Sequence, residues 1–316
     1  MDTTTAPILP VARRWLWLRR LLGAIWLANA AFHYLAWVYS PGGANRVLAA
    51  FDQARVAPPW LAPALSALHD GIATLGAERF ALFLILLEVL LGLALLTGYR
   101  VRTFLVLGLA YSAFCWVALD ALGYPYGGGQ TDPGVFIAYL LAFLFAWRAL
   151  GLIEGAPAEA EPFRRERLLF GLLWAFDAAL KWQPYFLTHF MDQLLPAAQG
   201  QPVWIAAYIR GIAAAVQWIG PGVVAVLVAV AETLLAASLL GGWFLRYAVP
   251  LGAAYSLAVW STAEGFGGPY GLTGTGVRGD VLGNVLIYVY LFAYLWSATL
   301  RRRGSNLPVL SRKFTE

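Results

Sequence analysis

The sequence predicts an all-α integral membrane protein with eight transmembrane helices, arranged as two parallel four-helix-bundle repeats with both termini in the cytoplasm. Three observations support this prediction: an apolar composition, a one-sided distribution of basic residues, and an internal repeat. Of the 316 residues, 60% are hydrophobic and 12% are charged, whereas an ordinary soluble domain has about 25% charged residues. We therefore do not expect a water-soluble globule.

Eight apolar stretches are candidates for membrane spans, because a hydrocarbon core about 30 Å thick needs roughly 20 apolar residues in a helix. The fourth stretch is short, and the fifth contains charged residues. No small-residue cleavage pattern follows the first stretch, so we expect it to be retained as a helix. The expected spans are residues 16–38, 80–96, 103–119, 134–147, 168–186, 223–240, 245–263 and 281–298.

The basic residues predict how these spans are oriented. If both termini lie inside the cell, 16 of the 22 Lys and Arg residues fall on cytoplasmic segments, as the positive-inside rule expects. The net charge of +5 is then a consequence of topology, and we do not expect nucleic acid as a partner. The expected location is the cell membrane, with the lipid bilayer as the surrounding partner.

Two long blocks of the sequence resemble each other. An offset of 144 residues aligns Glu88 with Glu232 and also aligns two Gly-x-Pro-Tyr-Gly motifs. Further upstream, the offset becomes 148. Because each half contains four expected spans, the two copies should have the same orientation. The expected units are residues 1–153, a polar cytoplasmic linker at 154–166, and residues 167–316.

Glu88 and Glu232 are the candidate catalytic residues, because both lie near the middle of an expected span. An ionisable group at the centre of a spanning helix costs about 2.5–3.5 kcal/mol on insertion scales, so such residues are candidates for function. One interpretation is proton transfer, or hydrogen bonding to a quinone or another substrate. The other is a structural carboxylate that is bonded to a neighbouring helix or paired with an arginine.

Two pairs of polar residues on the first helix of each half are candidates for substrate binding. Asn29 and His33 are four residues apart, as are Asp177 and Lys181, so each pair shares one helix face. The same spacing suits an ion pair between Asp177 and Lys181. His33 is suited to proton transfer near neutral pH, but a simple hydrogen-bonded histidine fits the sequence as well.

The outer loops after the third and seventh spans contain the other candidate substrate-binding residues. Each loop combines an acidic residue, a Gly-x-Pro-Tyr-Gly motif and a later aspartate. One interpretation is turn formation with helix capping by Asp132 and Asp280. The alternative is anion binding in the second half, because Arg278 has no counterpart in the first. The candidates are Asp120, Tyr126, Asp132, Glu264, Tyr270, Arg278 and Asp280.

No motif for a nucleotide, metal or haem is present, and the single cysteine, Cys115, excludes a dithiol relay within the chain. We therefore expect no cofactor that a sequence motif would bind. A metal site is not expected either.

The four-span unit resembles the DoxX/DoxD superfamily. The resemblance rests on Gly-Leu-Leu-Trp-x-x-Asp-Ala-Ala-x-Lys-Trp at 171–182, a mid-span Glu followed by Leu-Leu, and the Gly-x-Pro-Tyr-Gly loop. DoxD is the membrane subunit of thiosulfate:quinone oxidoreductase. The resemblance implies oxidation of thiosulfate to tetrathionate at the outer face, electron transfer to membrane quinone, and a partner subunit resembling DoxA.

In this hypothesis Glu88 and Glu232 exchange the protons of quinone chemistry, and Lys181 or Arg278 attracts the anion. Two other classes of function fit the same sequence. One is a transporter for a small anion or sulfur compound, because parallel repeats with polar residues near the midplane suit alternating access. The other is a non-catalytic assembly or anchor subunit of a redox complex.

Overall fold

The computed structural model describes residues 10–124, 126, 129–154, 161, 163–268, 283 and 285–305. Every regular element in these ranges is a helix. The long helices of the first half are α1 (Pro10–His33), α4 (Ala77–Thr97), α5 (Val101–Ala118) and α6 (Phe136–Ile153). Those of the second half are α7 (Arg164–Lys181), α11 (Pro221–Gly241), α12 (Leu245–Ser261) and α13 (Val285–Ser305).

Shorter elements connect the long helices. In the first half these are a π-helical continuation of α1 (Tyr34–Tyr39), α2 (Gly43–Phe51), α3 (Ala62–Leu75) and the 3-10 turn Ala121–Gly123. In the second half they are α8 (Pro184–Thr188), α9 (Met191–Leu194), the 3-10 turn Leu195–Ala198, α10 (Val203–Ile219) and the 3-10 turn Gly265–Gly267.

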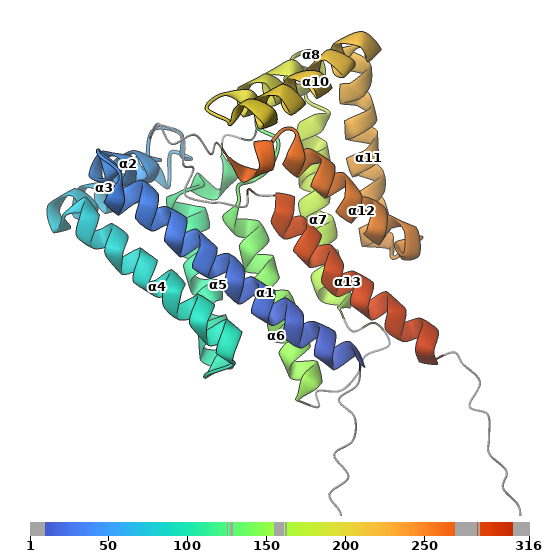
Figure 1. Cartoon of the computed structure of the whole chain (residues 1–316), viewed down its shortest axis with the longest axis horizontal. Coiled ribbons are helices and arrows are strands. Elements are labelled where there is room, and N and C mark those ends of the chain that lie inside the picture. Colours follow the sequence, from blue (N-terminus) through green and yellow to red (C-terminus); the bar gives the residue numbers. More distant parts are fainter. Residues whose placement is uncertain are drawn as a thin grey trace, which may run out of the picture.

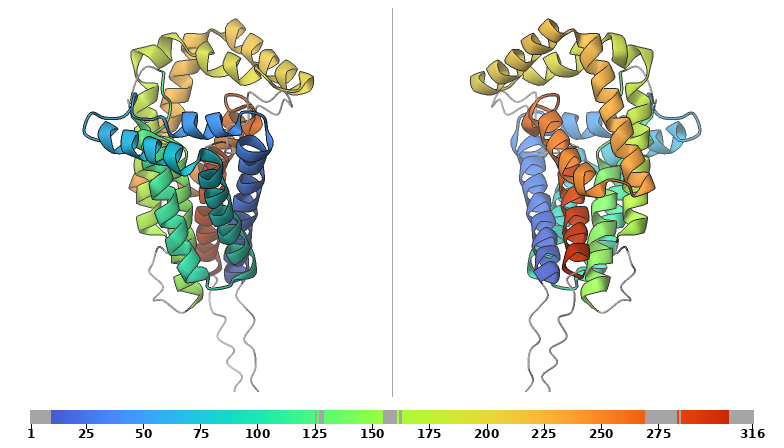
Figure 2. Two further views of the ribbon diagram at one scale, coloured as in Figure 1. Left: turned by 90° about the vertical axis from the view of Figure 1, so that its left-hand side faces the viewer. Right: turned by 90° about the vertical axis from the view of Figure 1, so that its right-hand side faces the viewer.

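The long helices run side by side, and the short ones lie across one end of the molecule (Figure 1). In the first half, α1 packs along α4 and α5 along α6; in the second, α7 packs along α11 and α12 along α13. The helices α2, α3, α8 and α10 lie at one end, and α1 begins and α13 ends at the other (Figure 2). The long helices therefore lie between one end that contains the short helices and another end where α1 begins and α13 ends.

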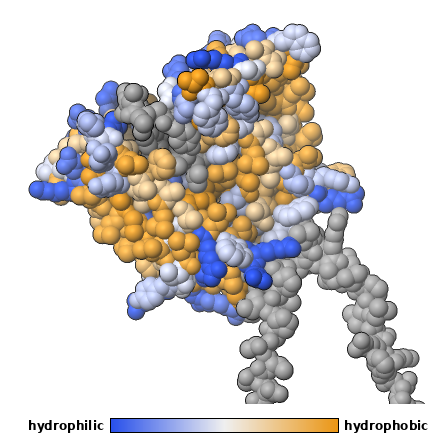
Figure 3. Space-filling model, in the orientation of Figure 1, coloured by the Kyte–Doolittle hydropathy of each residue, from blue (hydrophilic) through white to orange (hydrophobic). Residues whose placement is uncertain are grey.

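In the part of the chain that the structure describes, five helical segments are long and apolar enough to cross a membrane. A broad hydrophobic zone covers the middle of the molecule, between more hydrophilic ends (Figure 3). These features indicate a membrane protein with lipid-facing helices. The five segments are Arg13–Tyr39, Ala77–Thr97, Val101–Ala118, Phe136–Ile153 and Pro221–Gly241.

The other three expected spans coincide with helices that are shorter or more charged. The helix α12 has 17 residues, and the apolar part of α13, Val285–Ala298, is also short. The helix α7 begins with Arg-Arg-Glu-Arg and also contains Asp177 and Lys181. Length and composition alone therefore do not identify these three helices as spans.

The expected boundaries differ from the observed ones at several helices, including α6, α7 and α13, which continues to Ser305 rather than ending at residue 298. The fifth span was expected to reach residue 186, but α7 ends at Lys181. The reason is Pro184, because the residue before a proline avoids the helical conformation, and Gln183 is extended with φ −69° and ψ 143°. The fourth was expected to end at residue 147, whereas α6 continues to Ile153.

The largest hydrophobic cluster among the described residues extends through both halves. Trp26 is fully buried in the first half, and Trp174 is almost fully buried in the second. Between the halves, the Trp15 indole N–H donates to Ser297 Oγ over 2.8 Å, and the Trp15 ring meets Phe163 edge to face with centroids 5.5 Å apart. The halves are therefore packed as one body rather than joined by the linker alone.

Gly23 of α1 and Gly92 of α4 allow these two helices to approach closely. A methyl group added at Gly23 would lie 2.7 Å from the Gly92 carbonyl oxygen, and one at Gly92 would lie 2.9 Å from the Gly23 carbonyl oxygen. Small residues at helix crossings are a common means of packing inside membranes.

We expect Gly23→Ala to lower stability by about 1–3 kcal/mol, because overpacking a tight contact forces the backbones apart. Gly71→Ala in α3 is the matched control, because no atom lies within 4 Å of the added methyl group. That substitution should be neutral, or stabilising by up to about 1 kcal/mol. Thermal unfolding in mild detergent measures both. Equal effects of the two substitutions would contradict the close-packing argument.

Candidate functional site

The first buried polar cluster surrounds Glu88 in the first half. His33 Nδ1 lies 2.8 Å from Glu88 Oε2, and the Tyr111 hydroxyl donates to Glu88 Oε1 over 2.8 Å. The Asn29 amide nitrogen donates to the Tyr139 hydroxyl over 2.9 Å. Glu88 is completely buried. Both of its carboxylate oxygens therefore have a partner from a neighbouring helix.

The second cluster surrounds Glu232 in the second half. The Tyr255 hydroxyl donates to Glu232 Oε1 over 2.6 Å, and Lys181 Nζ lies 3.4 Å from Glu232 Oε2. The Tyr288 hydroxyl donates to Asp177 Oδ2 over 2.8 Å. Asp177 and Glu232 are each 4% exposed. The cluster thus places two carboxylates and one ammonium group in the interior.

The ion pair considered between Asp177 and Lys181 does not form. Lys181 Nζ instead approaches Glu232 and donates to the Thr131 carbonyl oxygen over 2.6 Å. Asp177 Oδ1 has no hydrogen-bond partner in the part of the chain that the structure describes. An unpaired buried carboxylate oxygen is unfavourable in free energy. Asp177 Oδ1 can therefore accept a hydrogen bond from a donor outside the chain.

The two clusters use corresponding positions but differ in charge. Where the first half has Asn29 and His33, the second has Asp177 and Lys181. Asn29 Oδ1 also lacks a partner in the described residues, but it belongs to a neutral amide. The second cluster therefore has the greater tendency to bind a polar ligand, because its unpaired atom belongs to a carboxyl group.

A cavity of about 780 Å³ lies between the second cluster on one side and the segment 186–200 and α10 on the other. This volume is within the usual range of about 300–1,000 Å³ for small-molecule sites. Asp177, Lys181 and Glu232 line it, as do aromatic residues that include Trp174 and Tyr255. Asn29, His33 and Glu88 do not line this cavity, and they do not line the smaller cavity of about 390 Å³ either.

The lining of the large cavity is strongly acidic. Lys181 is the one basic residue among the residues that line it within the described chain, and it already contacts Glu232 and a carbonyl oxygen. A dianion would meet net repulsion there, because like charges in a low-dielectric site repel strongly. The acidic residues in the lining are Asp132, Asp177, Asp192, Glu232 and Glu264.

A loop from the first half contributes Thr131 and Asp132 to the lining of this cavity. Besides the contact of Lys181 with Thr131, the Gln183 side chain donates to the Tyr126 carbonyl oxygen over 2.8 Å. The Gln193 side chain donates to the Gly129 carbonyl oxygen over 3.0 Å. The second half therefore binds three backbone carbonyl groups of the first-half loop, and the two halves complete one site together.

The acidic residues of the outer loops act partly as helix caps, although not the ones expected. Phe136 N–H at the start of α6 donates to Asp120 Oδ2 over 3.0 Å, and Val285 N–H donates to Glu264 Oε1 over 3.1 Å. Asp132 instead accepts the Gly134 N–H over 2.9 Å, which is two residues before the helix. The interpretation of Asp132 as the cap of this helix was therefore wrong.

The remaining loop candidates lie away from the cluster or outside the described residues. Tyr126 is 41% exposed and packs edge to face against Phe176 with centroids 5.3 Å apart. It is not among the cavity-lining residues. Tyr270, Arg278 and Asp280 lie outside the residues that the structure describes.

Four tyrosines belong to the clusters but were not among the sequence candidates: Tyr111, Tyr139, Tyr255 and Tyr288. The repeat contained a signal for one pair, because Tyr111 and Tyr255 are aligned at the offset of 144. The other pair, Tyr139 and Tyr288, is aligned at an offset of 149, which also aligns Trp147 with Trp296. Within the described residues, no group of three His, Cys, Asp or Glu side chains is placed to hold a metal ion.

We expect Lys181→Met to lower the free energy of unfolding by roughly 3–5 kcal/mol, because removing one partner leaves buried charges uncompensated. The double variant Lys181→Met/Glu232→Gln should recover much of this loss, since it also removes the carboxylate that the lysine neutralises. Thermal unfolding in detergent at alkaline pH compares the two. An additive, larger loss in the double variant would rule out a stabilising Lys181–Glu232 pair.

No family model, curated protein or solved structure matches this chain.

Proposed function

We propose that this chain is a multi-pass protein of the cell membrane with eight spans, built as two parallel four-helix repeats with both termini in the cytoplasm. The support is the presence of a helix at each expected span and the recurrence of the Tyr–Glu hydrogen bond at Glu88 and Glu232. The concentration of basic residues on one side supports the orientation.

Within this membrane protein, we infer a quinone-linked function, in which the second half binds membrane quinol or quinone. The observation on which this rests is Asp177 Oδ1, a buried carboxylate oxygen without a partner in the described chain, in the wall of a cavity of about 780 Å³. A ring with two hydroxyl or carbonyl groups matches an aromatic-lined cavity that contains both donors and acceptors.

The cavity residues fit such a ligand in both of its protonation states. Lys181 is a hydrogen-bond donor suited to a carbonyl oxygen, and Asp177 and Glu232 are acceptors suited to hydroxyl groups. When bound, a quinone supplies the two-electron, two-proton redox chemistry. Glu232 would exchange protons at its carboxylate, and Tyr255 would hold that carboxylate in position through the hydrogen bond of 2.6 Å.

The resemblance to the DoxX/DoxD superfamily supports the redox interpretation and names thiosulfate as the electron donor. The acidic lining argues against thiosulfate binding within this cavity, because five acidic residues face one lysine there. In our proposal the anion is therefore oxidised on a partner subunit resembling DoxA, and this chain is the quinone-binding membrane subunit. The same acidic lining weighs against a small-anion transporter.

We expect Asp177→Asn and Glu232→Gln each to weaken quinol binding roughly tenfold or more, because a hydrogen bond to a charged group contributes about 1.5–3 kcal/mol. Binding of a short-chain quinol to the purified chain in detergent measures this directly. Thiosulfate-dependent quinone reduction by the intact complex, with its bound subunits identified, measures the consequence for turnover.

Glu88→Gln is the matched control, because it is the same substitution at the corresponding position, away from the cavity. It should leave quinol affinity unchanged while altering stability. Unaltered binding in both cavity variants would refute the quinone site. Uptake of a sulfur compound by sealed vesicles without a redox partner would then favour transport, and co-purification with a soluble oxidoreductase without quinol binding would favour an assembly role.

A further inference from the structure

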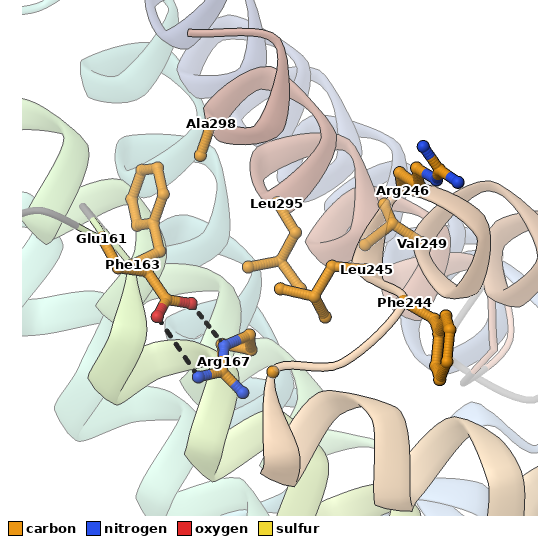
Figure 4. Close-up of a pocket in the computed structure, with 10 residues that line it drawn as sticks. Glu161, Phe163, Arg167, Phe244, Leu245, Arg246, Val249, Leu295 and Ala298 are labelled. Carbon is orange, nitrogen blue, oxygen red and sulfur yellow. Dashed lines mark hydrogen bonds and ion pairs between the residues drawn. The ribbon is translucent and has the colours of Figure 1, made fainter. Parts of the chain in front are cut away.

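A second cavity, of about 390 Å³, lies at the end of the second half where α7 begins, α11 ends and α12 begins. Its wall is mainly apolar, with Phe163, Leu245, Val249 and Leu295 facing the same space (Figure 4). It lies at the opposite end of these helices from the acidic cavity and shares no lining residue with it. It is therefore a separate site.

Two arginines line this cavity, and within the described residues only Arg167 has an acidic partner. Arg167 Nε lies 2.5 Å from Glu161 Oε1, and its guanidinium also donates to the carbonyl oxygens of Leu239 and Leu240 at the end of α11. Arg246 also lines the cavity, but its guanidinium points away from Phe163 and Leu295 (Figure 4) and lies 4.4 Å from the centroid of the Tyr247 ring. It has no acidic partner among the described residues.

The corresponding arginine of the first half differs from Arg246, because it does have an acidic partner. Arg102, at the offset of 144 from Arg246, forms an ion pair with Glu154. Its Nε lies 3.0 Å from Glu154 Oε2. One copy of this position is thus compensated within the chain, whereas Arg246 is exposed beside the apolar cavity and has no acidic partner in the described part of the chain.

Exposed aromatic residues surround the rim. Trp243 is 65% exposed, Phe244 75% and Tyr247 51%. Three large exposed aromatics would be unfavourable at an aqueous surface, but they are typical of the interface between hydrocarbon and lipid headgroups. The cavity therefore lies at the depth where the phosphate of a phospholipid meets its acyl chains.

We propose that this cavity binds an anionic phospholipid, with the phosphate at Arg246 and part of an acyl chain against the apolar wall. Unpaired basic groups next to pockets between membrane helices recognise anionic headgroups. The apolar wall favours a lipid over a free phosphate ion, because a free ion gains nothing from burying hydrocarbon surface. This proposal is independent of the quinone function.

The test is native mass spectrometry of the full chain, purified in mild detergent and mixed with phosphatidylglycerol or phosphatidylcholine. We expect preferential retention of phosphatidylglycerol and a loss of about fivefold in that retention on Arg246→Gln, from the usual contribution of one basic residue near a membrane surface. Retention of phosphatidylcholine should not change.

Arg100→Gln is the matched control, because Arg100 is exposed at the α4–α5 turn, beside the Tyr99 ring at 5.7 Å, and lines neither cavity. It removes the same charge and should leave retention unchanged. Equal losses in the two variants would overturn the proposal in favour of general surface attraction. Displacement of the lipid by inorganic phosphate alone would overturn the lipid assignment.

A further variant, Ala298→Phe, places a ring in the cavity and should reduce retention of phosphatidylglycerol without removing charge. Because this residue is partly buried, its thermal unfolding is measured alongside. If this variant does not fold, Arg246→Gln still decides the question, since Arg246 is exposed.

Discussion

A carboxylate in an apolar interior needs hydrogen-bond or ion-pair partners, and this need determines how each half is assembled. Glu88 takes partners from α1 and α5, and Glu232 takes partners from α7 and α12. A second hydrogen bond in each half reaches the remaining long helix, through Asn29 in one and Asp177 in the other. Because a buried charge without a partner is strongly unfavourable, these contacts define which helices must be neighbours.

The same pattern of contacts has different consequences in the two halves, because the chain continues differently after α1 than after α7. After His33, α1 continues as a π-helical segment that places Trp37 against the histidine ring, with centroids 4.1 Å apart. After Lys181, Pro184 forces the chain away into α8. In our proposal this difference leaves the first half a structural support and makes the second half the ligand-binding one.

Much of this arrangement could be anticipated from composition and spacing. The mid-span position of Glu88 and Glu232 predicted buried carboxylates, and both are buried. The four-residue spacing predicted that Asp177 and Lys181 share a face, and both line one cavity. The same spacing did not predict their partners, because an ion pair between them competes with contacts to Glu232 and Tyr288 that come from distant helices.

The sequence by itself determined the helical, apolar character of the chain, because this depends on composition and on contacts within one helix. Only the tertiary structure decided which tyrosine meets which carboxylate and that the Thr131 carbonyl binds Lys181. Such contacts join residues from 23 to 111 positions apart. They follow from how the helices pack against each other, which no local pattern encodes.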